Sequence, residues 1–140
     1  MNLSLLPVDP KPIVAPSERR FPTWHFSMMN DESRNDSIAN CIRDAGVVGK
    51  TVFEIGTGAG LTAMLFAKHG ARKIVTCESD DQMYSIAQKT IEKNQLNDKI
   101  EIFHGTSSQF LNSVQSDFSP EIIFTETLDC GVVGEGFYSI

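Results

Sequence analysis

Two acidic residues frame a glycine-rich stretch near the end of the chain. Glu126 directly follows the apolar segment EIIFT (121–125), and Glu135 comes nine positions later, with GVVG between them. Two carboxylates that converge suit a guanidinium, because its planar fork of N–H donors matches carboxylate oxygens bidentately. The alternative is a pair of unrelated surface acids, and the spacing alone does not decide between the two.

A glycine-rich turn earlier in the chain is a candidate ligand-binding loop. EIGTGAG (54–60) begins with the last two residues of the apolar run TVFEI (51–55) and precedes LTAMLFAKHG (61–70). Glycines between a strand and a helix let a ligand touch the backbone, because no Cβ blocks its approach. The dinucleotide fingerprint G-x-G-x-x-G requires glycine at the position that Leu61 holds here, which weakens a pyrophosphate interpretation. A tight turn without a ligand is the other interpretation.

A third acid strengthens the ligand hypothesis. Glu78 closes the next apolar run, eighteen residues after Gly60. A carboxylate at the end of the second strand can accept two hydrogen bonds from ribose hydroxyls. The alternative is a solvated loop acid, since the segment ESDD is rich in acids. The glycine loop and Glu78 together favour a ligand that carries a ribose.

The periodicity predicts the elements that would position these residues. A helix begins near Asn30 or Asp31, either of which can cap it, and stops near Gly46. The pattern then predicts strands over 51–55, 73–77, 99–104 and 121–125, and helices over 61–70, 80–94 and 108–116. Strands alternating with helices at this spacing predict an α/β fold with a mostly parallel sheet. Ligands of such sheets bind beyond the carboxyl ends of the strands, where the glycine loop, Glu78 and Glu126 all lie.

Composition excludes several classes of function. Twelve basic against eighteen acidic residues give a net charge of -6, the opposite of what nucleic-acid binding through phosphates requires. No apolar run approaches the roughly 20 residues of a membrane span, and the first residues lack a signal peptide's basic region and cleavage site. The three cysteines form no C-x-x-C pair, so we expect no metal site and a reducing compartment, the cytoplasm with the nucleus as an alternative.

At this point the motifs resemble those of the protein arginine methyltransferases, and within that family a divergent branch built of tandem modules. Glu126 and Glu135 are similar to the family's pair of glutamates nine apart, which is the most specific part of the match. EIGTGAG resembles the family's S-adenosylmethionine loop and Glu78 its ribose acid. WHFSMMNDESRN (24–35) resembles the family's M-L-x-D-x-x-R segment. The resemblance runs from Trp24 to Tyr138 and implies a Rossmann-like class I S-adenosylmethionine-dependent methyltransferase domain.

The resemblance also implies roles for individual residues. Glu126 and Glu135 are the expected catalytic pair, Met28 would flank the methionine end of S-adenosylmethionine, and Arg34 would hold its carboxylate. After the third strand the family often has a glutamate on the adenine, and this chain offers Gln109 there. The full expected cofactor set is Met28, Arg34, Glu54, Gly56, Thr57, Gly58, Gly60, Leu61, Glu78, Ser79, Ser107, Ser108, Gln109 and Glu126. No metal is expected, and each of the three histidines is expected to be structural or solvated, with His25 nearest the cofactor segment.

The domain organisation departs from the family in length. Five of the six prolines fall in residues 7–22, so residues 1–22 are expected to be an extended arm or linker. Residues 23–140 would be the N-terminal part of the methyltransferase domain, truncated after the fourth strand and without the family's later strands and β-barrel. The bare sheet edge would then be a place for self-association.

The resemblance implies methyl transfer from S-adenosylmethionine to the guanidinium of arginine in a protein or peptide, with this chain as the cofactor-binding part. Three alternatives stay open. The first is a catalytically inactive cofactor-binding or assembly module, the second a nicotinamide-dependent oxidoreductase, and the third a methyltransferase for a small molecule.

Overall fold

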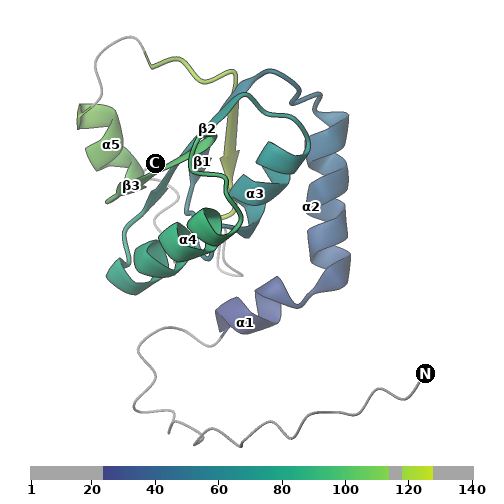
Figure 1. The fold of residues 1–140 in the computed structure, drawn as a ribbon, viewed down its shortest axis with the longest axis horizontal. Coiled ribbons are helices and arrows are strands. Elements are labelled where there is room, and N and C mark those ends of the chain that lie inside the picture. Colours follow the sequence, from purple (N-terminus) through teal and green to yellow (C-terminus); the bar gives the residue numbers. More distant parts are fainter. Residues whose placement is uncertain (1–23, 114–117, 128–140) are drawn as a thin grey trace, which may run out of the picture.

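The structure is a computed structural model that describes residues 24–113 and 118–127. The described part begins with two helices, after which strands and helices alternate along the chain, as Figure 1 shows. The helices are α1 (Trp24–Met29), α2 (Glu32–Asp44), α3 (Leu61–Lys68), α4 (Asp81–Lys93) and α5 (Ser107–Ser113). The strands are β1 (Thr51–Ile55), β2 (Lys73–Glu78), β3 (Ile100–His104) and β4 (Ile122–Thr125).

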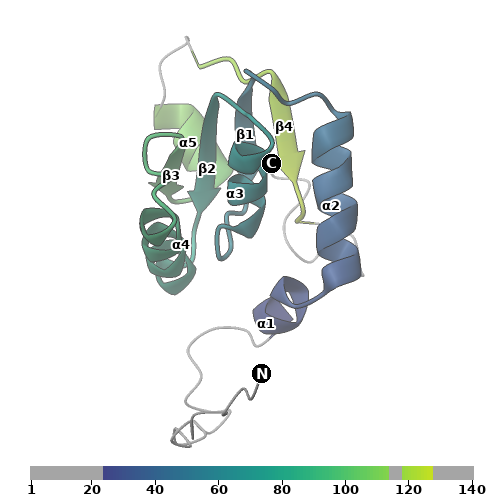
Figure 2. The same ribbon diagram turned by 45° about the vertical axis from the view of Figure 1, so that its right-hand side comes forward.

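All described strands pair in parallel, in the order β3-β2-β1-β4 (Figure 2). The chain first steps outward from β1 to β2 and β3, and then returns to place β4 on the other side of β1. The direction of winding therefore reverses at β1, which makes the space beyond the ends of β1 and β4 the switch point of the sheet. The α/β fold and the parallel sheet predicted from the sequence are confirmed.

Two apolar clusters hold the sheet between helices. Alternate residues of a strand point to opposite faces, so Val52 of β1 packs with α2 and α3 while its neighbour Phe53 points the other way. The first cluster joins Val52 to Phe66 and Ile91, and the second joins Phe53 to Phe110 of α5. Phe53 and Phe110 stack with ring centroids 5.0 Å apart. Burial on both faces fixes the strand register and thereby the positions of the loops at the strand ends.

The predicted elements are present with small shifts at their ends. The predicted strand 51–55 has the same bounds in the structure, and the helix predicted over 108–116 begins at Ser107. Asp31 is the N-cap of α2, since its side chain accepts the backbone N–H of Arg34 at 3.0 Å. Helix α1 was not predicted. It lies beyond the sheet, at the end to which the arrow of β4 points (Figure 2).

No helix in the part of the chain that the structure describes is both long enough and apolar enough to span a bilayer. The predicted arm of residues 1–22 and the acid Glu135 both lie outside the described residues.

Candidate active site

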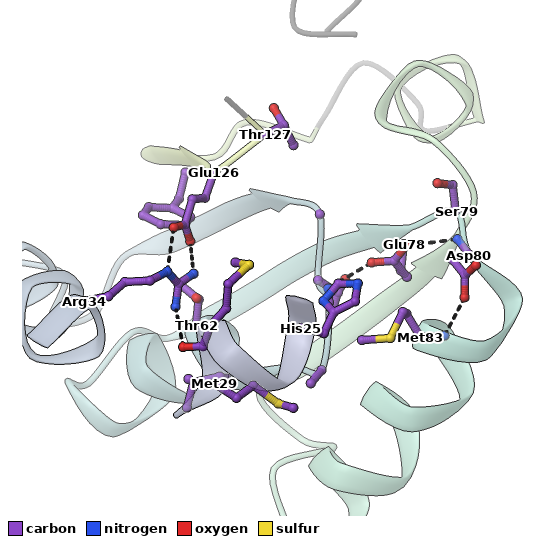
Figure 3. A pocket seen from close by; sticks show the side chains of 17 residues that line it. His25, Met29, Arg34, Thr62, Glu78, Ser79, Asp80, Met83, Glu126 and Thr127 are labelled. Atoms are coloured by element: carbon purple, nitrogen blue, oxygen red, sulfur yellow. Dashed lines mark hydrogen bonds and ion pairs between the residues drawn. The ribbon is translucent and has the colours of Figure 1, made fainter. Parts of the chain in front are cut away.

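An open cavity of about 640 Å³ lies at the carboxyl ends of β1, β2 and β4 (Figure 3). Its volume is in the range of small-molecule sites. The glycine loop after β1, the acid that ends β2 and the acid that follows β4 all line it, as the sequence predicted. Its described lining residues are His25, Met28, Met29, Arg34, Gly56, Thr57, Gly58, Ala59, Leu61, Thr62, Glu78, Ser79, Asp80, Met83, Phe124, Glu126 and Thr127.

The glycine loop offers a ligand a surface to pack against rather than free backbone N–H donors. The amides of Gly56 and Thr57 both donate to the carbonyl of Cys77, at 3.1 and 3.0 Å, and the amide of Gly60 donates to the carbonyl of Thr57 at 2.9 Å. The amide of Gly58 donates to Glu78 Oε2 at 2.9 Å. A phosphate site needs backbone N–H groups aimed at the ligand, and these four are already engaged within the chain. The loop therefore suits a ligand that packs against it without a pyrophosphate.

Glu78 is held by two backbone donors. Besides the amide of Gly58, it accepts the amide of Asp80 on Oε1 at 2.9 Å. Each carboxylate oxygen has a second lone pair, so the side chain can still accept hydroxyl donors from a ligand in the cavity. The two bonds fix the carboxylate at the rim of the glycine loop, which is the geometry that a ribose contact requires.

Glu54 lies beneath the cavity and does not line it. It is 1% exposed, and its Oε2 has no hydrogen-bond partner among the described residues. Burial raises the pKa of this carboxyl to about 8, an effect that a hydrogen bond from Thr76 opposes and the negative charges of Glu78 and Glu126 reinforce. The cavity therefore has a largely neutral acid under its floor at pH 7.

Arg34 and Glu126, 92 positions apart, meet at one wall of the cavity (Figure 3). Arg34 Nε donates to Glu126 Oε1 at 2.8 Å, and Arg34 Nη2 pairs with Glu126 Oε2. A second set of contacts steadies the guanidinium, since Nη1 donates to Asn35 Oδ1 at 2.9 Å and to the Met28 carbonyl at 3.4 Å. Glu126 thus accepts a guanidinium fork bidentately. The guanidinium is the chain's own.

Helix α1 covers the cavity with residues that the sequence analysis did not assign to the site. His25 and Met29 line the cavity together with Met28, because a short helix places positions three and four apart on one side. The helix is tied to α2 by the side chain of Asn35, whose Nδ2 donates to the Met29 carbonyl at 2.9 Å. The sequence feature that could have identified His25 as a lining residue is its position three residues before Met28. The first turns of α3 and α4 contribute Thr62 and Met83 in the same unpredicted way.

The other predicted residues fall into three groups. Nine of the predicted cofactor set line the cavity: Met28, Arg34, Gly56, Thr57, Gly58, Leu61, Glu78, Ser79 and Glu126. Gly60 instead caps α3 with a φ of +90°, a conformation that favours glycine. Ser107, Ser108 and Gln109 belong to α5 and are not lining residues, and Gln109 Oε1 accepts the amide of Thr106 at 2.9 Å. Their predicted contact with adenine stays a prediction.

Within residues 24–113 and 118–127, no group of three or more histidine, cysteine or acidic side chains could hold a metal ion.

Comparison with known proteins bears directly on this arrangement. Residues 39–128 match the family model described as O-methyltransferase. The chain is 36% identical over 121 residues to the arginine N(omega)-methyltransferase of Streptomyces achromogenes subsp. streptozoticus, a match that covers 86% of this chain and 33% of that protein. It is 36% identical over 114 residues to protein arginine N-methyltransferase 9 of Xenopus laevis, which covers 81% of this chain and 14% of that protein.

A solved structure of a protein arginine methyltransferase complex also matches this chain. The PRMT1 enzyme–prozyme heterotetrameric complex of Trypanosoma brucei with AdoHcy superposes with a TM-score of 0.69 at 25% identity, covering 81% of this chain and 35% of that one. The chain spans a third or less of the length of these two curated relatives. The residues that match the family model include β1 to β4, the strands of the described sheet. The chain belongs to this methyltransferase family, with the class I S-adenosylmethionine-dependent fold, and its resemblance to the protein arginine N-methyltransferases is confirmed.

Proposed function

We propose that this chain is the cofactor-binding part of an enzyme that methylates the guanidinium of arginine with S-adenosylmethionine. The observation that carries the proposal is the cavity wall where Glu126 holds a guanidinium bidentately, opposite the glycine loop and Glu78. One cavity thus combines an acceptor for the reacting group with the groups that suit a nucleoside. The names of both relatives give arginine as the group that they methylate.

The residues present fit S-adenosylmethionine better than a dinucleotide. Glu78 can take the ribose hydroxyls, and Arg34 is the only lysine or arginine among the described lining residues, so it is the partner for a ligand carboxylate. Because four backbone amides of the loop donate to groups within the chain, few hydrogen-bond donors remain for a pyrophosphate. These features favour the methyltransferase hypothesis over the nicotinamide-dependent one.

The chain's contribution to the reaction is positioning and charge. When bound, S-adenosylmethionine supplies an electrophilic methyl carbon, whose transfer to a guanidinium nitrogen leaves S-adenosylhomocysteine and one proton. A free guanidinium stays protonated at neutral pH, which makes its nitrogens poor nucleophiles. Glu126, with Glu135 as its predicted partner, would orient the fork and concentrate electron density on the nitrogen that faces the cavity. The group that accepts the proton is not assigned.

Binding of S-adenosylhomocysteine tests the proposal on this chain directly. The wild-type chain should bind it in isothermal titration calorimetry, and Glu78→Gln should weaken binding about 10- to 100-fold, the range for loss of a hydrogen bond to a charged group. Glu101→Gln is the matched control, because Glu101 is exposed on β3 and pairs with Lys73 away from the cavity. A wild-type chain that binds NAD and not S-adenosylhomocysteine would contradict the proposal.

The two relatives suggest two forms of the substrate. One is named for arginine and the other for protein arginine, so free arginine is a second candidate beside an arginine in a peptide. Methyl transfer by the whole protein, measured with free arginine and with an arginine peptide at equal concentration, separates the two. We propose that the substrate is an arginine in a peptide. A clear preference for free arginine would contradict this proposal.

A further inference from the structure

The ion pair between Arg34 and Glu126 joins the two halves of the proposed site. Arg34 is the cation available to an anionic ligand group, and Glu126 is the acceptor available to a cationic substrate group. Their side chains are 21% and 39% exposed, so a ligand in the cavity can reach both. In this structure each of the two is bound to the other (Figure 3).

The donors of Arg34 are nearly all in use. A guanidinium has five N–H groups, and Arg34 spends two on Glu126, one on Asn35 and one on the Met28 carbonyl. Among the contacts with described residues, one N–H is left for a further acceptor. A ligand carboxylate that binds Arg34 through two parallel hydrogen bonds must therefore displace a contact that is already made.

The position of Arg34 also favours exchange of its partner. It lies in the first turn of α2, where the helix macrodipole disfavours a cation and an anion is stabilising. A carboxylate near this helix end gains from both the guanidinium and the helix. Glu126 supplies that carboxylate here, and a ligand carboxylate in the same cavity would compete for the same place.

We propose that Arg34 is a resident guanidinium that blocks Glu126 until a carboxylate bound in the same cavity draws it away. This inference rests on the proposed function and deepens it by giving the order of events. An amino-acid-type carboxylate binds Arg34 first, Glu126 is released, and the guanidinium of the substrate then takes the oxygens that Arg34 has left. Substrate binding in the absence of the carboxylate ligand is weak, because a chemically identical group already fills the acceptor.

The test measures how one ligand changes the affinity of the other. Ethylguanidinium is the substrate probe, since it carries the arginine head group without a carboxylate of its own. S-adenosylhomocysteine is the ligand with an amino-acid carboxylate, and 5′-methylthioadenosine is its matched control, which keeps the nucleoside and the thioether and lacks the carboxylate. NMR titration of the full chain, with each nucleoside at saturation, gives the dissociation constants.

S-adenosylhomocysteine should tighten ethylguanidinium binding at least about fivefold, the lower end of typical couplings between sites, and 5′-methylthioadenosine should leave it within about twofold. Linkage requires the reverse effect to be equal, so ethylguanidinium should tighten S-adenosylhomocysteine by the same factor. This comparison needs no variant, and therefore does not depend on how any substitution folds.

Variants then identify the residue responsible. Arg34→Gln should bind ethylguanidinium without any nucleoside about as tightly as the wild type does with S-adenosylhomocysteine, and the coupling should disappear. Arg34→Lys keeps the charge and loses the fork, which separates occupancy of Glu126 from simple charge repulsion. Arg43→Gln is the matched control, because Arg43 is an exposed arginine of the same helix that pairs with Asp44.

Three results would overturn the inference. They are equal coupling by the two nucleosides, no gain of ethylguanidinium binding in Arg34→Gln, and no ethylguanidinium binding by the wild type with S-adenosylhomocysteine bound. The first two would mean that Arg34 keeps its hold on Glu126 and orients it. Failure of the wild-type chain to bind S-adenosylhomocysteine is a separate result, which contradicts the proposed function itself.

Discussion

Glu54 is a carboxyl group at the centre of the sheet. Its register partners are Thr76 on β2 and Phe124 on β4, so the side chain has a strand on either side. Thr76 in turn hydrogen-bonds to Thr57 of the glycine loop, with 2.7 Å between the hydroxyl oxygens. The acid is therefore linked through two hydroxyls to the loop that lines the cavity, and its protonation state bears on the loop above it.

The pH dependence of stability should report this carboxyl. Its pKa is about 8 in the folded chain against 4.5 for an ordinary glutamate, so the folded state holds a proton that the unfolded state releases. The stabilising effect of that proton is complete below pH 4.5 and is lost as the pH rises to about 8. The slope in between is about 1.4 kcal/mol per pH unit in the free energy of unfolding.

Urea unfolding at several pH values between 5 and 8.5 measures this slope. Glu54→Gln should lose that part of the pH dependence and become steadily more stable relative to the wild type as the pH rises. Glu92→Gln, a substitution at an exposed position of α4, should keep the wild-type profile. Parallel profiles for wild type and Glu54→Gln would show that the carboxyl is not held protonated.

Single residues were predictable where the strand ends are marked by residue type. Glu78, Glu126 and the glycine loop could be placed at one edge of the sheet because parallel strands end together. The pairing of Arg34 with Glu126 could not be predicted, because a motif tells which ligand group a side chain suits and not which neighbour holds it when the ligand is absent. The burial of Glu54 depends on what packs over it, which lies outside its own motif.

At the scale of elements, the strands and the longer helices follow from their hydrophobic pattern, whereas α1 does not. It has six residues and neither an acid in its first turn nor a base in its last. Helices this short are marginal by themselves, so tertiary contacts must hold them. Here the side chains of Arg34 and Asn35 donate to carbonyls at its end, contacts that no local pattern reveals.

Helix α4 allows a capping test at the edge of the cavity. Asp80 Oδ1 accepts the amides of Gln82 and Met83, both at 2.9 Å, so Asp80→Ala should lower the free energy of unfolding by about 1 kcal/mol. Asp80→Asn should restore most of it, because asparagine caps as well as aspartate does. Asp98→Ala, at an exposed position, is the control. Thermal unfolding followed by circular dichroism gives the comparison, and equal losses for Asp80→Ala and Asp80→Asn would contradict a capping role.

At the scale of the whole molecule, the described sheet has β4 at one edge. No described strand pairs with its outer side, and Ile123 on this strand is 65% exposed. Unpaired strand edges with apolar side chains are templates for pairing with another chain. We therefore predict that the 140-residue chain self-associates as its concentration rises, with β4 in the contact.

Sedimentation velocity over a range of concentrations tests this prediction. Ile123→Lys should shift the chain toward monomer, since a lysine on an edge strand opposes strand pairing by charge. Val48→Lys adds the same charge at an apolar position that is 76% exposed in the turn before β1, away from the sheet edge, and should leave association unchanged. Equal dissociation in both variants would attribute the effect to net charge, and a wild-type chain that stays monomeric at all concentrations would mean that the β4 edge is not an association surface.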